Sequence, residues 1–313
     1  MLAVAGRPPD HAGWAIEMKW DGVRAIVICE TGGCRFYSRN RREITGSYPE
    51  LAATLTELAD GRELILDGEI IAQTPDGAPS FGLLQRRMHV VRPSKQLIAA
   101  VPVQLFLFDI LTDSGDSLTA LPYLERRDRL RALEFTAAPV QTPPHWIGVD
   151  PEQLMTAARD NHLEGIVSKR VDSTYQPGRR SPAWIKTPLR KTTEAIVVGW
   201  TTGNGAMSTT FGSLILAAHD HGRKLVYIGN VGTGFTAAAR RSLRAQLDEI
   251  ARPDSVLTET PGRGRAGIGV AHWVDPVLVG DIEYREYTGD GLRHPSWRGL
   301  RNDKTPAEIT LPT

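Results

Sequence analysis

The apolar positions of the chain repeat in two patterns, one typical of strands and one typical of helices. Short segments with alternating apolar and polar positions and many β-branched residues predict half-buried strands. These predicted strands are residues 14–19, 25–29, 35–38, 64–72, 103–110 and 165–170. Three segments between them have the pattern of helices, at residues 48–59, 121–133 and 150–162. Ser47 precedes the first predicted helix, and Asp150 with Pro151 opens the third as an N-cap and first-turn proline.

The order of these elements indicates the class of fold. The first three predicted strands follow one another at hairpin spacing, with no helix between them. Parallel strands need long crossover connections, so this order favours antiparallel sheets over a doubly wound parallel sheet. Residues 1–190 are therefore predicted to form a mixed α+β domain with antiparallel sheets and flanking helices.

A second pattern begins after a basic stretch marked by proline, residues 184–193. Strands are predicted at 194–201, 212–218, 224–230 and 277–287, around one helix at 236–251 with Thr236 as its N-cap. Several strands and one helix in roughly 120 residues are typical of a small barrel, for which the OB-fold is one candidate. We assign residues 191–313 to this second domain, with a Gly- and Arg-rich loop at 261–269.

Composition narrows the possible partners. Hydrophobic residues make up 41% of the chain and charged residues 23%, which excludes collagen-like and wholly disordered chains. The 37 Lys and Arg nearly cancel the 36 Asp and Glu, so a polyanion would have to bind local basic groups. These groups are residues 39–42, 86–87, 169–170, 179–180, 186–191 and 240–244.

The expected compartment follows from the cysteines and from apolar run lengths. Cys29 and Cys34 are five positions apart, and we expect neither a disulfide framework nor a paired metal-binding motif from them. No run of about 18 apolar residues and no secretory leader occurs, so we expect no membrane partner. A reducing cytoplasm is the expected location.

Lys19 is the sharpest local signal. It ends a predicted strand between apolar neighbours and is followed by Asp21, Gly22 and Arg24. A lysine that is desolvated or close to other cations can become a neutral amine and act as a nucleophile. The alternative interpretation of this segment is an ordinary surface hairpin.

Further motifs recur in a fixed order along the chain. They are Lys19 to Arg24, Tyr37 to Asn40, Leu66 to Glu69, Leu107 to Leu111, Glu164 to Lys169, Trp184 to Lys186 and Trp297 to Lys304. In this order they resemble the covalent lysyl nucleotidyltransferases, namely DNA ligases, RNA ligases and messenger RNA capping enzymes. The details are most similar to the ATP-dependent ligase module of bacterial end-joining ligase D, as the segment 229–234 also indicates.

This resemblance implies a nucleotidyltransferase domain followed by an OB-fold domain, and a three-step reaction. Lys19 attacks the α-phosphate of ATP, AMP passes to a DNA 5′-phosphate, and the 3′-hydroxyl then displaces AMP. In-line phosphoryl transfer of this kind depends on positioning and on neutralising charge.

The resemblance also implies roles for single residues. Phe108 stacks on the adenine opposite Val167, and Glu17 lies near its exocyclic amine. Arg24 and Arg39 reach the ribose and the phosphates or the DNA end. The implied oxygen ligands for Mg²⁺ or Mn²⁺ are Asp21, Glu69 and Glu164, with the ribose as the alternative partner of Glu69. Lys186 meets the α-phosphate, and the implied pyrophosphate contacts from the second domain are Arg301, Asp303 and Lys304.

The fifth motif departs from the family. Many members have Lys-x-Lys where this chain has Lys186, Thr187 and Pro188. Arg190 and Lys191 are the candidates to replace the second lysine, while Pro188 changes the backbone near the domain boundary.

The implied partners are duplex DNA with nicks or ends and, by family analogy, the end-binding protein Ku. We expect a monomer in the cytoplasm, associated with the nucleoid. Two alternatives stay open: an RNA ligase or capping-type nucleotidyltransferase, and a non-catalytic OB-fold protein that binds nucleic acid and has kept the motifs as relics.

Overall fold

The computed structural model describes residues 1–75, 77–203, 205, 209–259 and 270–312. The Gly- and Arg-rich loop predicted at 261–269 lies outside these described residues. Two compact units divide the chain, Met1–Leu189 and Arg190–Thr313, and each is described by itself. Within the described ranges, no helix combines the length and apolar character needed to cross a bilayer.

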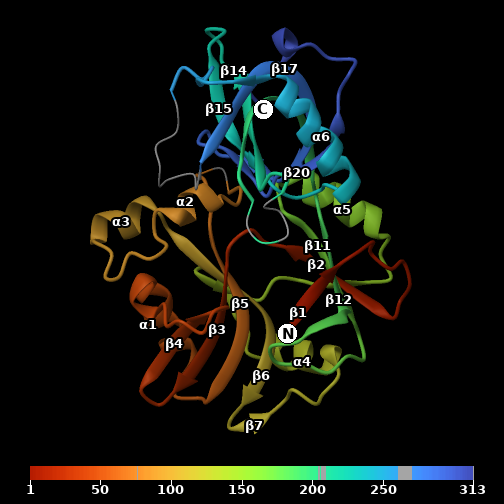
Figure 1. The fold of residues 1–313 in the computed structure, drawn as a ribbon. Helices are drawn as coiled ribbons and strands as arrows, with labels where there is room; N and C mark the ends of the chain where they lie inside the picture. Colours follow the sequence, from red (N-terminus) through yellow and green to blue (C-terminus); the bar gives the residue numbers. More distant parts are fainter. Residues whose placement is uncertain (76, 204, 206–208, 260–269, 313) are drawn as a thin grey trace. The chain divides into compact units, whose positions relative to one another are not determined.

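Unit 1 contains most of the chain's helices and two curved sheets (Figure 1). Its helices are α1 (Pro49–Ala59), α2 (Phe81–Gln85), α3 (Lys95–Ala100), α4 (Tyr123–Arg131), α5 (Pro151–Asp160) and the 3-10 turn η1 (Thr45–Ser47). One sheet has the order β4-β3-β5-β6-β9-β8, with β7 on β6. Its strands are β3 (Val23–Glu30), β4 (Gly33–Ser38), β5 (Leu64–Ala72), β6 (Val103–Asp113), β7 (Asp116–Ser117), β8 (Thr136–Ala137) and β9 (Val140–Gln141).

The other sheet of unit 1 has the order β1-β12-β11-β2-β10. Its strands are β1 (Leu2–Ala5), β2 (Trp14–Lys19), β10 (Trp146–Ile147), β11 (Gly165–Arg170) and β12 (Arg180–Pro188). Most pairings are antiparallel, as the sequence predicts; β1 with β12 and β6 with β9 are parallel. The predicted α+β class with antiparallel sheets is confirmed.

The core of unit 1 lies between α1 and the sheet that contains β3 to β6. Leu51 and Leu55 of α1 are fully buried against Val27 of β3 and Leu66 of β5. This follows from the sequence, since apolar residues four apart share one face of a helix and alternate residues share one face of a strand.

The N-terminus of α1 differs from the prediction. Tyr48, which the prediction placed inside the helix, occupies the N-cap position, and its side chain makes no capping hydrogen bond. Ser47 instead closes the preceding 3-10 turn, and Pro49 starts the helix because its ring already has a helical φ. Asp150 does cap α5, accepting a hydrogen bond from the amide of Glu152 at 3.0 Å.

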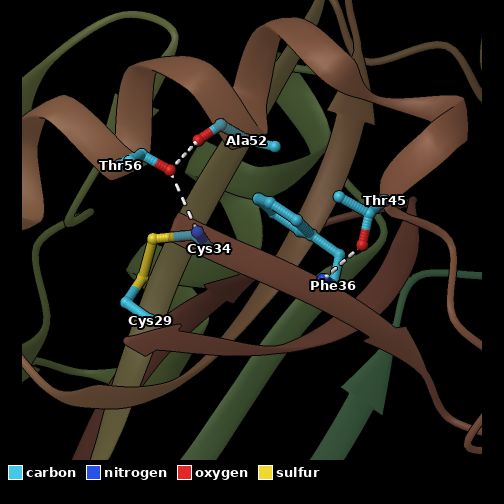
Figure 2. Close-up of a disulfide and its surroundings, with 6 residues drawn as sticks. All are labelled: Cys29, Cys34, Phe36, Thr45, Ala52 and Thr56. Carbon is cyan, nitrogen blue, oxygen red and sulfur yellow. Dashed lines mark hydrogen bonds between the residues drawn. A yellow bond between two sulfur atoms is a disulfide. The ribbon is translucent and has the colours of Figure 1, made fainter. Parts of the chain in front are cut away.

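The two cysteines correct the sequence analysis, which expected no disulfide framework. Cys29 of β3 and Cys34 of β4 are directly opposite in the hairpin and form a disulfide (Figure 2). Five positions with a turn between them match the register of a tight hairpin, and both side chains are buried under α1. Thr56 of α1 accepts a hydrogen bond from the Cys34 amide at 3.0 Å and donates to the carbonyl of Ala52.

Unit 2 is built on an antiparallel sheet in the order β15-β14-β13-β17-β16, with β20 on β17 and a ribbon of β18 and β19. Its elements are β13 (Lys191–Thr201), β14 (Ser213–His219), β15 (Leu225–Val231), α6 (Ala237–Glu249), β16 (Ala251–Arg252), β17 (Ala271–Tyr284), β18 (Glu286–Tyr287), β19 (Leu292–Arg293), β20 (Ser296–Leu300) and the 3-10 turn η3 (Pro306–Glu308). Thr236 caps α6 as predicted, and Leu243 and Leu247 pack into the core of this sheet.

Candidate active site

Lys19 lies at the C-terminal end of β2, where the segment that precedes β11 contacts it. Its Nζ donates to Oε2 of Glu164, and its carbonyl accepts from the Glu164 amide at 3.1 Å. Gly165, which follows Glu164, has φ +134°. It lies so close to β12 that a Cβ would approach the carbonyl oxygen of Thr187 to 2.2 Å. Glycine is therefore required where the strands that hold Lys19 and Glu164 converge.

A cavity of about 240 Å³ opens beside Lys19 and is lined by strands of both sheets of unit 1. Its lining contains eight residues predicted from the sequence as nucleotide ligands: Glu17, Lys19, Arg24, Arg39, Glu69, Phe108, Val167 and Lys186. Side chains from six strands and one turn thus come together in one cavity, which we call the nucleotide cavity.

Glu17, near the C-terminal end of β2, lies in a cluster of charged side chains. Its carboxylate contacts the Lys169 ammonium at 2.6 Å and the Arg127 guanidinium at 3.6 Å, and it accepts a hydrogen bond from the Tyr123 hydroxyl. Burial alone would raise the pKa of Glu17, but Lys169 and Arg127 lower it below its ordinary value. Glu17 is therefore an ionised hydrogen-bond acceptor at neutral pH.

Lys169 also shapes the apolar side of the cavity. Its Nζ lies 4.5 Å from the centre of the Phe108 ring and 4.3 Å from that of Trp184, within the range of cation–π attraction. Only 2% of Lys169 is exposed. Phe108 and Trp184 meet edge to face, so the aromatic wall is fixed before any base arrives.

Arg24 is held by a buried acid. Its guanidinium donates to both carboxylate oxygens of Asp67, at 2.9 and 2.6 Å, and the Tyr175 hydroxyl donates to the same carboxylate at 2.8 Å. The register of β3 with β5 explains this contact, since Arg24 pairs with Glu69 and Ile26 with Asp67. A bidentate pair fixes the plane of the guanidinium at the cavity wall.

Glu69 lines the nucleotide cavity and has a raised pKa. Burial raises its pKa to about 7, although Lys19 and Arg24 act in the opposite direction. Glu164 also raises the Glu69 pKa, because two carboxylates near one lysine repel each other. Asp21 follows β2 and is not among the described residues that line the cavity.

The donor set fits a divalent ion that is shared with phosphates. The described residues contain no cluster of three or more His, Cys, Asp or Glu side chains suited to a metal. Mg²⁺ is commonly held by one or two carboxylates together with substrate phosphates, and Glu69 and Glu164 beside Lys19 provide that number.

The predicted pyrophosphate contacts lie in unit 2. Arg301 follows β20 and pairs with Glu194 of β13 at 2.7 Å and with Asp303 at 2.8 Å. The hydrogen bond from Arg301 lowers the pKa of Asp303 to about 2. The Lys304 amide donates to the Arg301 carbonyl at 3.3 Å, which closes a turn. Arg190 also belongs to unit 2, where it pairs with Glu283 at 3.7 Å.

Three of the basic residues that the sequence suggested as DNA contacts are buried. Arg87 is fully buried and binds Glu50 and two backbone carbonyls. Arg240 is 5% exposed and donates to the carbonyls of Phe211 and Gly232, and Lys169 is inside the Glu17 cluster. These cations stabilise the fold, because each is neutralised or hydrogen-bonded where it is buried.

The sequence analysis missed several residues at this site. Trp184 and Arg180 line the nucleotide cavity, and Asp67 holds Arg24. Asp67 and Trp184 belong to motifs that the sequence analysis identified. The motifs therefore indicated these segments, but not which residues their side chains contact. The pairing of Arg24 with Asp67 depends on the register of two strands whose paired residues are 43 positions apart.

Comparison with known proteins shows the family of this chain. Residues 9–187 match the family model described as ATP dependent DNA ligase domain, and residues 207–304 match the ATP dependent DNA ligase C terminal region. The ligase domain of LigD from Mycobacterium tuberculosis is 34% identical, with a TM-score of 0.54, over 99% of this chain and 97% of that domain. A mycobacterial DNA ligase D solved with ATP and MES is 33% identical, with the same TM-score and coverage.

Among curated proteins, the multifunctional non-homologous end joining protein LigD of Mycolicibacterium smegmatis is 39% identical over 99% of this chain. The chain spans 39% of the length of that relative. The two family models together match most of the chain, which belongs to the ATP-dependent DNA ligase family. The predicted combination of nucleotidyltransferase and OB-fold domains is the fold that this likeness supports.

Proposed function

We propose that this chain is an ATP-dependent DNA ligase that joins 5′-phosphate and 3′-hydroxyl ends in duplex DNA, with a lysyl-AMP on Lys19 as its first intermediate. The observation that carries the proposal is the position of Lys19 at the edge of a cavity that also contains Phe108, Arg24 and Lys186. A base, a ribose and an α-phosphate each find a suitable partner there.

In the first step the Lys19 nitrogen forms a bond to the α-phosphorus, and the bond to the pyrophosphate oxygen breaks. The amine has to lose a proton before it attacks, and the Glu164 carboxylate already accepts a hydrogen bond from it. This contact supports Glu164 as the group that orients Lys19 and receives or relays that proton.

The other residues of the nucleotide cavity bind different parts of the nucleotide. Phe108 and Val167 enclose the adenine, and ionised Glu17 accepts a hydrogen bond from its amino group. Arg24, fixed by Asp67, and Arg39 bind the ribose and the phosphates or the DNA end, and Lys186 binds the α-phosphate. Guanidinium and ammonium groups neutralise the charge that develops on the phosphoryl oxygens.

A Mg²⁺ or Mn²⁺ ion bound to the triphosphate would supply charge neutralisation at the reacting phosphorus. Glu69 and Glu164 are the carboxylates suited to hold it, and Glu69 alternatively accepts a hydrogen bond from the ribose. Asp21, two residues after Lys19, is the third candidate ligand.

We assign residues 1–190 to the adenylation domain and 191–313 to the OB-fold domain. Arg301 and Lys304 of the second domain are then the partners of the pyrophosphate during the first step. Both side chains are partly exposed within unit 2, which supports this role because part of each cation is accessible to a substrate.

The relatives' names support a place in end joining, with nicks or ends of duplex DNA as substrate. We propose a monomer that acts in the cytoplasm on nucleoid DNA, with the end-binding protein Ku as a partner.

The test uses α-labelled ATP with Mg²⁺ or Mn²⁺. A labelled protein band that nicked DNA with a 5′-phosphate then discharges supports ligase activity. Labelling by α-labelled GTP in place of ATP would indicate a capping-type enzyme, and discharge to RNA alone would indicate an RNA ligase. Absence of any label under both ions would favour the non-catalytic OB-fold alternative.

A further inference from the structure

Two buried residues of α4, Tyr123 and Arg127, contact Glu17, the acid that the proposed function assigns to the adenine amino group. They are four residues apart, so both side chains leave the same face of the helix. Neither is among the described residues that line the nucleotide cavity, whereas Glu17 is. Any influence of these two residues on the nucleotide therefore acts through Glu17.

Both oxygens of the Glu17 carboxylate have fixed partners inside the protein. Oε1 accepts a hydrogen bond from the Tyr123 hydroxyl and lies 3.6 Å from Nε of Arg127. Oε2 lies 2.6 Å from the Lys169 ammonium. Because Glu17 is only 6% exposed, these contacts set the plane of its carboxylate before a base arrives.

Arg127 is itself held by its surroundings. Its guanidinium donates to the carbonyls of Leu107 and Pro143 and, at 3.5 Å, to Nδ1 of His145. Arg127 is buried, and Glu17 is its one acidic partner in the part of the chain that the structure describes. The charge of Arg127 therefore has a fixed position beside the Glu17 carboxylate.

One buried carboxylate thus faces two buried cations. Lys169 alone would neutralise Glu17, and a second cation has to be desolvated at a cost that a single ion pair would avoid. Stability alone does not explain this arrangement. Its electrostatic effect is to favour the ionised carboxylate: burial acts to raise the pKa of Glu17, but Lys169 and Arg127 lower it below its ordinary value.

The state of the Glu17 carboxyl group decides which purine edge it can bind. An ionised carboxylate only accepts hydrogen bonds, so it pairs with the 6-amino group of adenine. Held opposite the 6-oxo oxygen of hypoxanthine or guanine, it would bring two acceptors together and disfavour that base. A neutral carboxyl group can instead donate to the 6-oxo oxygen, and the discrimination between the two kinds of base is then lost.

We propose that Tyr123 and Arg127 are positioning residues that make the nucleotide cavity selective for 6-aminopurine over 6-oxopurine nucleotides, by holding Glu17 as an acceptor-only group. The proposal rests on the proposed function, which assigns the adenine amino group to Glu17. The register of β2 with β11 supports that assignment, because Val167 pairs with Glu17 and also lines the nucleotide cavity.

The test compares ATP with inosine 5′-triphosphate (ITP), which has an oxygen in place of the 6-amino group. Equilibrium dissociation constants for both nucleotides are measured without a divalent ion, and the unaltered protein should prefer ATP. Tyr123→Phe removes only the hydroxyl, and Arg127→Met removes the charge but keeps most of the side-chain length. Each variant loses a contact to a charged group, so the preference should fall roughly tenfold, and Arg127→Lys should restore part of it.

Tyr175→Phe is the matched control. Tyr175 is also buried, and its hydroxyl also donates to a carboxylate, that of Asp67, at 2.8 Å. Asp67 holds Arg24 rather than Glu17, so this variant should change the affinities for ATP and ITP by the same factor. A general loss of stability would likewise lower both affinities together, so the ratio of the two separates positioning from folding. Tyr123→Phe keeps the test decisive if Arg127→Met does not fold.

An unchanged ratio of ATP to ITP affinity in Tyr123→Phe, or an equal fall of that ratio in Tyr175→Phe, would overturn the proposal. So would equal affinities of the unaltered protein for ATP and ITP. Labelling with ATP and Mg²⁺ separates this proposal from the ligase function. An unaltered protein that prefers ATP but forms no lysyl-AMP would refute the ligase function and leave the selectivity standing, because the binding measurement needs no catalysis.

Discussion

The charged groups of unit 1 and those of unit 2 are organised in opposite ways. Around the nucleotide cavity, Glu17, Asp67 and Lys169 are buried and fixed by partners on other strands. In unit 2, Arg301 and Asp303 form an exposed cluster near the end of the chain. The buried groups are arranged before a substrate binds, whereas under the proposed function Arg301 would exchange its carboxylate partners for phosphate oxygens. This difference predicts that substitutions of charged residues in unit 1 reduce stability or activity more than those in unit 2.

The largest expected effect is that of Lys19→Ala. The variant lacks the amine that bonds to phosphorus, so formation of the lysyl-AMP should fall below detection. Joining of a nicked DNA that already carries the 5′-adenylate should persist, because that step does not use the lysine as nucleophile. Radiolabel transfer to the protein and gel analysis of the joined DNA check the two steps separately.

Asp109→Asn should give the next largest effect, on stability. Asp109 and Arg126 are both fully buried and form two hydrogen bonds, at 2.7 and 2.9 Å. Breaking a buried ion pair leaves one charge without a partner and costs about 3–5 kcal/mol of unfolding free energy. Urea unfolding measures the loss.

The matched control for Asp109→Asn is Arg131→Gln on the same helix as Arg126. The pair of Arg131 with Asp128 is exposed, so its loss should change the free energy of unfolding by less than about 1 kcal/mol. Similar losses in the two variants would contradict the contrast between buried and exposed pairs.

Arg301→Ala tests whether the exposed cluster takes part in chemistry. If it neutralises the leaving pyrophosphate, lysyl-AMP formation should slow about 100-fold. Joining of preformed DNA-adenylate should change much less. Arg252→Gln removes a comparable exposed pair, with Asp275 at 3.2 Å, and should leave the rate within about twofold. Equal rates in Arg301→Ala and Arg252→Gln would reduce the Arg301 cluster to a surface ion pair.

Glu69 should produce the smallest effect, seen as a pH dependence. Its pKa is raised to about 7 by burial, so the carboxyl is mostly neutral at pH 6 and mostly ionised at pH 8. Only the ionised form binds a metal ion or accepts strongly from the ribose. The rate of lysyl-AMP formation should therefore rise with pH, by about tenfold from this group. Glu69→Gln should remove that part of the rise, and an unaltered profile would exclude Glu69 from the step.

Sequence patterns predicted the elements whose apolar alternation is regular. The strands 14–19, 64–72 and 165–170 have those bounds in the structure, and the helices differ from prediction by a few residues at their ends. Strand β12 was not predicted, because Pro182 and Pro188 are unusual in a strand and the segment resembled a linker.

The sequence predicted residues that the structure brings together in one cavity, but it did not predict the partners that hold them. Motif order identified Lys19, Arg24 and Phe108, which line one cavity. The pairing of Arg24 with Asp67 and of Glu17 with Lys169 depends on how strands are placed in the sheets, which a local pattern does not contain. The same holds for the cations that are buried, such as Arg87, since nothing in the sequence of a basic pair after a helix marks it as buried.

The most direct test of the account is the mass of the protein after incubation with ATP and a divalent ion. The account predicts an added AMP on the peptide that contains Lys19, lost when 5′-phosphorylated nicked DNA is supplied. An intact, folded protein that gains no AMP with either Mg²⁺ or Mn²⁺, or that carries it on another residue, would contradict it.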